Sequence, residues 1–125
     1  MTRLGLTFAF LGAFAALQAG CGENCQSTCD HIYSESECDV RELGRTADRS
    51  IRDCVARCEN ALQQVGDLGD YDPYVKRPAT EKVELENEKQ AAAWIDCVWD
   101  FAPQQGPSAG CVDIDPATGG YCAPI

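Results

Sequence analysis

The chain has 125 residues, nine cysteines and a net charge of −10. This length fits one domain with a hydrophobic core of modest size. The acidic excess argues against nucleic acid as a partner, because phosphates attract lysine and arginine, and it disfavours peripheral binding to anionic lipid headgroups. Solubility is the first consequence that we expect of this charge, and a cationic partner is the second.

The first 20 residues have the features of an export signal. Arg3 provides one positive charge near the start, and an almost unbroken apolar run follows over residues 4–17. A transmembrane helix needs about 20 apolar residues, so the run is too short to span a bilayer. Its length suits the hydrophobic region of a signal peptide.

Two small residues, Ala19 and Gly20, lead directly into Cys21. This ending resembles the lipobox of bacterial lipoproteins, in which the cysteine is lipidated on sulfur and becomes the new N-terminus. The resemblance covers residues 1–21. It implies a signal peptide over residues 1–20, acyl chains such as palmitate on Cys21, and attachment to the outer membrane on its periplasmic or surface face. An ordinary signal peptide cut near Ala19 or Gly20, with Cys21 in a disulfide, is the alternative.

The number of cysteines agrees with lipidation of Cys21, because an even number then remains and no thiol need be left over. The remaining eight are Cys25, Cys29, Cys38, Cys54, Cys58, Cys97, Cys111 and Cys122. An exported chain meets an oxidising compartment, where disulfides can compensate for a small core. We therefore expect a lipid-anchored tether over residues 21–24 and one cysteine-rich domain over residues 25–125. The mature chain resembles small uncharacterised cysteine-rich bacterial lipoproteins, a likeness that implies no activity.

Two CxxxC segments place Cys25 with Cys29, and Cys54 with Cys58, one helical turn apart on one face. Two such helices laid antiparallel can be joined twice. The pattern resembles the twin-CxxxC helical hairpins of small mitochondrial intermembrane-space chaperones and of plant hairpin peptides. The resemblance covers residues 25–58 and implies the pairs Cys25–Cys58 and Cys29–Cys54, without implying a function.

Capping residues and periodicity predict the first two helices. The first begins at Glu23 or Asn24 and runs to about Tyr33. The second begins after Thr46, whose side chain can cap the free backbone N–H groups, and ends at Gly66 through a left-handed backbone. Its apolar stripe consists of Ile51, Cys54, Val55, Cys58, Leu62 and Val65.

Residues 66–78 contain two glycines and two prolines and predict an irregular crossover, with Tyr71 and Tyr74 folded back on the helices. A third helix begins after Thr80 or after Asn87, both of which can cap it, and stops before Pro103. Residues 104–125 lack periodicity and are expected to form an irregular tail. The predicted fold is all-α, a small disulfide-stapled domain made of a helical hairpin and a third helix, with long irregular loops.

The four outer cysteines allow three pairings. An antiparallel third helix would return Cys97 towards the loop that holds Cys38, which leaves Cys111 with Cys122. Cys38–Cys97 and Cys111–Cys122 are therefore our first prediction. The pairs Cys38–Cys111 and Cys97–Cys122 remain open, because the tail must be fastened to something.

Motifs for catalysis are absent from the sequence, which has no serine nucleophile elbow, phosphate-binding glycine loop or metal-binding histidine pair. Structural zinc and redox-active dithiols usually use CxxC spacing. The acidic loops around residues 67–72 and 113–115 do not match a calcium-binding pattern. His31 is expected on the surface. Trp94, Trp99 and Phe101 are expected in the core, with an outward contact patch as the alternative for Trp99.

These observations predict a non-enzymatic, lipid-anchored cell-envelope protein without a cofactor or a metal. Its role would be structural or would consist in binding an envelope protein partner, with no role for nucleic acid. The alternative is a thiol–disulfide or metal-handling envelope protein that uses the CxxxC pairs.

Overall fold

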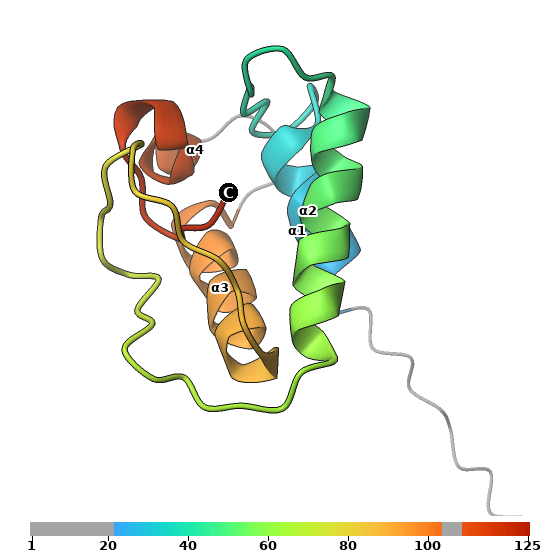
Figure 1. The fold of residues 1–125 in the computed structure, drawn as a ribbon. Helices are drawn as coiled ribbons and strands as arrows, with labels where there is room; N and C mark the ends of the chain where they lie inside the picture. Colours follow the sequence, from blue (N-terminus) through green and yellow to red (C-terminus); the bar gives the residue numbers. More distant parts are fainter. Residues whose placement is uncertain (1–21, 104–108) are drawn as a thin grey trace, which may run out of the picture.

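The computed structural model describes residues 22–103 and 109–125. These residues form the α-helices α1 (Cys25–Tyr33), α2 (Ala47–Leu62), α3 (Glu88–Phe101) and α4 (Ala109–Ile114), and the 3-10 turn η1 (Pro116–Thr118). The domain is all-α and disulfide-stapled, as predicted. In Figure 1, α1 and α2 lie side by side, α3 lies across from them, and α4 sits beyond the far end of α3. None of the helices in the described ranges is long and apolar enough to cross a membrane.

Side-chain caps fix the starts of the first two helices. The Asn24 side chain accepts a hydrogen bond from the Ser27 backbone N–H (2.9 Å), and the Ser27 hydroxyl accepts one from the Asn24 N–H (2.9 Å). This reciprocal pair satisfies two backbone donors that a helix start leaves free. Thr46 accepts from the Arg49 N–H at the start of α2. Both starts agree with the sequence prediction.

The end of α2 differs from the prediction. The helix stops at Leu62, and the side chains of Leu62 and Val65 are 44% and 92% exposed instead of completing the apolar stripe. The chain leaves the helix early because the Glu88 N–H binds the Gln64 carbonyl (2.9 Å), which draws this segment to the start of α3. Gly66 serves this close approach, since an added Cβ would lie 2.7 Å from the Asn87 side-chain nitrogen.

Asn87, and not Thr80, caps the third helix. Its side-chain oxygen accepts from the backbone N–H groups of Lys89 and Gln90, at 3.1 Å each. The Gln90 side chain in turn accepts from the Glu86 N–H (2.9 Å), one residue before the cap. α3 ends at Phe101, ahead of Pro103 as predicted.

The C-terminal tail contains more structure than its sequence indicated. α4 and η1 replace the expected irregular chain, and the backbone then turns back onto the crossover. The Cys122 N–H donates to the Pro73 carbonyl (2.7 Å), and the Arg77 N–H donates to the Gly120 carbonyl (3.0 Å). α4 has six residues, of which Cys111 and Ile114 are buried, and this length is too short to give a periodic signal in the sequence.

The core lies between the hairpin and α3. Its largest fully buried side chains include Trp94 and Val98 of α3, Ile32 and Tyr33 of α1, and Ile114 of α4. Burial raises the pKa of the Tyr33 phenol well above its ordinary value. Seven of the core residues are cysteines, so disulfide sulfur fills space that aliphatic side chains would otherwise occupy.

We expect Gly66→Ala to destabilise the domain by about 1–3 kcal/mol, because the new methyl group would overlap the Asn87 side chain. Asn87→Gly keeps an acceptable helix cap and removes the overlapping atoms. In that background the cost of Gly66→Ala should fall by at least half. Urea unfolding of the four proteins in this cycle measures the coupling, and an equal cost in both backgrounds would contradict the packing described here.

Candidate functional site

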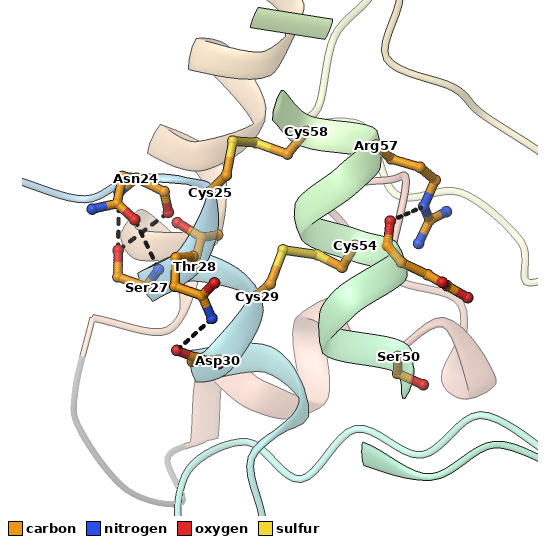
Figure 2. The surroundings of a disulfide bond; sticks show 12 residues. Asn24, Cys25, Ser27, Thr28, Cys29, Asp30, Ser50, Cys54, Arg57 and Cys58 are labelled. Carbon is orange, nitrogen blue, oxygen red and sulfur yellow. Dashed lines mark hydrogen bonds between the residues drawn. A yellow bond between two sulfur atoms is a disulfide. The ribbon is translucent and has the colours of Figure 1, made fainter. Parts of the chain in front are cut away.

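The hairpin carries the two predicted disulfides (Figure 2). Cys25 binds Cys58 and Cys29 binds Cys54, with Cα–Cα distances of 5.7 and 5.9 Å. All four residues are at most 3% exposed. The two cross-links therefore hold α1 against α2 at successive turns, as the CxxxC spacing and the hairpin resemblance predicted.

The other two disulfides correct our first prediction. Cys38 binds Cys111, and Cys97 binds Cys122, so the pairs Cys38–Cys97 and Cys111–Cys122 were wrong. The physical reason is the tail: α4 brings Cys111 over the loop that holds Cys38, and the following chain returns to α3. The Pro73 carbonyl marks this return, because it lies 3.3 Å from the Cys97 sulfur and accepts the Cys122 N–H.

Every cysteine in the described part of the chain is thus disulfide-bonded to another one. Four disulfides in a domain of this size indicate an oxidising, exported environment. The cysteines act here as cross-links rather than as thiolate nucleophiles or ligands. Cys21, the predicted lipidation site, lies outside the described residues.

His31 is buried, which corrects the expectation of a surface side chain. Its ring is 0% exposed and stacks on Trp99 of α3, with centroids 4.5 Å apart and planes 13° apart. Trp99 also donates from its indole nitrogen to the Thr28 hydroxyl (2.9 Å). Trp99 is therefore a half-buried bridge from α3 to α1, and it forms no outward patch.

Both nitrogens of His31 meet acceptors. Nδ1 contacts the Glu37 carboxylate, and Nε2 lies 2.6 Å from the Ala102 carbonyl oxygen. A carboxylate and a carbonyl can only accept, so both hydrogen bonds form when each ring nitrogen carries a proton. The ring itself lies flat on the face of Trp99.

This cluster joins α1 and the loop directly after it to the end of α3, which lies 71 residues farther along the chain. Each polar atom of His31 is already engaged, and its ring is covered. The arrangement suits a structural clasp better than acid–base chemistry, which needs an accessible nitrogen. The spacing of Thr28 and His31, three residues apart beside the cysteine stripe of α1, was the sequence signal for this face.

Three carboxylates of the acidic loops contact other groups of the domain. Asp67 forms an ion pair with Lys89 (2.8 Å), whose hydrogen bond and positive charge lower the pKa of that carboxyl. Asp72 accepts from the Tyr74 N–H, and Asp115 accepts from the Ala117 N–H at the start of η1. Residues 22–103 and 109–125 contain no group of three or more histidine, cysteine or acidic side chains that could hold a metal ion.

One cleft of about 300 Å³ opens between the crossover and the C-terminal segment. Arg57, Arg77 and Lys82 line it together with Glu81 and Glu84. Arg77 is already paired with Glu81. The mixed charges favour no particular class of ligand.

Comparison with known proteins found no matching family model, curated protein or solved structure. The fold and the disulfides by themselves define the class: a small, exported, disulfide-stapled all-α domain.

Replacing His31 by phenylalanine should keep the stacking on Trp99 and remove both hydrogen bonds. We expect a loss of about 2 kcal/mol in unfolding free energy, because the buried Ala102 carbonyl would lose its donor. Glu37→Gln should also destabilise. Glu35→Gln, whose carboxylate is 76% exposed and pairs with Arg41, is the matched control and should change stability by less than about 0.5 kcal/mol. Equal effects of the two glutamate substitutions in urea unfolding would contradict the clasp.

Proposed function

We propose that this chain is a non-enzymatic lipoprotein of the cell envelope, held on a membrane by a lipid on Cys21. Residues 25–125 act as a rigid scaffold that is structural or binds a partner. The observation that carries the proposal is the closed set of disulfides. The other eight cysteines pair among themselves, so an intramolecular disulfide with Cys21 would require one of these pairs to break.

The lipobox-like ending of residues 1–21 supports the same assignment from the sequence side. Two or three acyl chains, each contributing about 0.8 kcal/mol per buried methylene, would keep the domain on the membrane. We place the anchor in the outer membrane, on its periplasmic or surface face, by the same resemblance. The enclosed position of His31, the single histidine of the chain, argues against acid–base catalysis by histidine.

Cys21→Ser should move the protein from the membrane fraction into the soluble fraction, because the acyl chains have no other attachment point in the proposal. Fractionation, together with metabolic labelling by a fatty acid, measures the change. The variant should unfold at the same urea concentration as the delipidated domain, which controls for misfolding. Persistent membrane attachment of a folded Cys21→Ser protein would contradict the proposed anchor.

The free-thiol content separates the scaffold from a thiol- or metal-handling protein. We expect no reactive thiol in purified, denatured but unreduced protein, because eight cysteines are cross-linked and the ninth carries a lipid. Thiol titration with an aromatic disulfide reagent and metal analysis by mass spectrometry make the measurement. Two or more thiols per chain, or stoichiometric zinc or copper, would favour the handling role.

A further inference from the structure

Three apolar side chains are exposed where α2 ends and the crossover begins. Leu62, Val65 and Leu68 are 44%, 92% and 41% exposed. Single exposed apolar residues are common on protein surfaces, and Leu43, Tyr74, Val75 and Val112 are such residues elsewhere in the chain. Leu62, Val65 and Leu68 differ because they follow one another at intervals of three residues at the end of α2, and grouped apolar side chains mark interaction sites.

Hydrogen bonds hold this segment in place. The Asn87 side chain donates to the Asp67 carbonyl (2.9 Å), and the Gln90 side chain donates to the Leu68 carbonyl (3.3 Å). The Lys89–Asp67 ion pair ties it to α3 a third time. The apolar side chains therefore project from an ordered loop that is fastened to the start of α3.

The same end of the domain receives the chain from Cys21. The Cys25–Cys58 disulfide joins the first residue of α1 to α2, and the second disulfide, one turn deeper, shows that the helices are antiparallel. α2 therefore continues past Cys58 on the side where the N-terminal chain arrives, and Leu62 lies one turn, about 6 Å, farther on. Figure 1 shows the loop after α2 at this end, and Figure 2 shows Asn24 beside the Cys25–Cys58 bond.

The tether is short. The chain from Cys21 to Cys25 spans at most about 14 Å when fully extended. A lipid on Cys21 would thus hold Cys25, and with it the neighbouring end of α2, close to the bilayer surface. The anchor would give the apolar side chains a high effective concentration at the bilayer surface. Side chains that are too few to bind a membrane by themselves can then still contact it.

We propose that Leu62, Val65 and Leu68 form a docking surface for the lipid bilayer, and that they orient the domain with the end of α2 against the membrane. This inference rests on the proposed lipid anchor at Cys21. The occupant is the interfacial region of a bilayer with little negative charge, since the acidic domain repels anionic headgroups.

The test uses the lipidated protein in phosphatidylcholine vesicles whose acyl chains carry bromine, a short-range quencher of tryptophan fluorescence. We expect at least twofold stronger quenching of the introduced tryptophan in Val65→Trp than in the matched control Leu43→Trp. Leu43 is also fully exposed but lies before the start of α2, a helix length of about 24 Å away. Trp94 and Trp99 contribute the same background to both proteins. Replacing Leu62 and Leu68 by glutamine should weaken the quenching in Val65→Trp.

Flotation of the vesicles distinguishes failure of the lipid anchor from failure of the docking surface. Lipidated protein that floats with the vesicles but shows equal quenching at positions 65 and 43 would overturn the docking and leave the anchor intact. Protein that does not float would overturn both. A dimer of soluble Cys21→Ser protein that dissociates on Val65→Gln, measured by sedimentation, would assign the patch to a second copy of the chain and overturn the membrane contact.

Discussion

The covalent pairing of α1 with α2 is the constraint on which the rest of the structure depends. α1 has nine residues, a length at which an isolated helix is marginal in water. Its buried face contains Ile32 as the one aliphatic side chain, beside two cysteines, Thr28, His31 and Tyr33, so it cannot be held by aliphatic packing alone. The Cys29–Cys54 bond, with a sequence separation of 25, contributes about 3–4 kcal/mol in the loop-entropy treatment. Once it has formed, Cys25–Cys58 closes only a small additional ring, and its main effect is to fix the angle between the helices.

The C-terminal half is attached to this hairpin by one disulfide and is closed on itself by another. Cys38–Cys111 bridges a sequence separation of 73, and Cys97–Cys122 fastens the last residues to α3. His31 lies beside the first of these bonds, because its Nε2 is 3.8 Å from the Cys38 sulfur. The ring therefore joins the hairpin to α3 at the place where the tail is cross-linked. The His31 contacts and the Cys38–Cys111 disulfide support one another, because Glu37 and Cys38 lie side by side in the loop after α1.

The parts of the fold that sequence reasoning predicted are those with local causes. Asn24 and Thr46 cap their helices through contacts three residues away, and the CxxxC spacing places two sulfurs on one face without any knowledge of the partner helix. The errors concern residues whose state is decided by distant segments. Val65 extends a helical stripe in sequence, but the start of α3 takes the backbone at Gln64 for its own hydrogen bond. His31 looks like a surface residue until α3 supplies Trp99 and a carbonyl group.

The candidate site also has parts with local causes and parts that depend on distant segments. The hairpin disulfides follow from a periodicity within each helix, whereas the pairing of the outer cysteines depends on α4, which has no periodic signal. The anchor at Cys21 stays a prediction, because its basis is the composition of the first 21 residues and the structure describes the chain from residue 22 onward. The sequence did not indicate the exposed apolar end of α2, because its periodicity predicts that the helix continues to Gly66 with Leu62 and Val65 in the apolar stripe.

Charge and geometry together restrict how an anchored domain of this kind can lie on a membrane. Without residues 1–20 the chain has nine basic and twenty acidic residues, a net charge of −11. Most faces of the domain are therefore repelled by anionic lipid, and the repulsion extends only about 8 Å at physiological ionic strength. The proposed tether would hold one end within that range. At this end the Asp67 charge is offset by Lys89, and Leu62, Val65 and Leu68 are exposed beside the carboxylates of Glu59 and Asp70. The end that the proposed anchor would turn towards the bilayer thus combines exposed apolar side chains with carboxylates, which favours a bilayer of low negative charge.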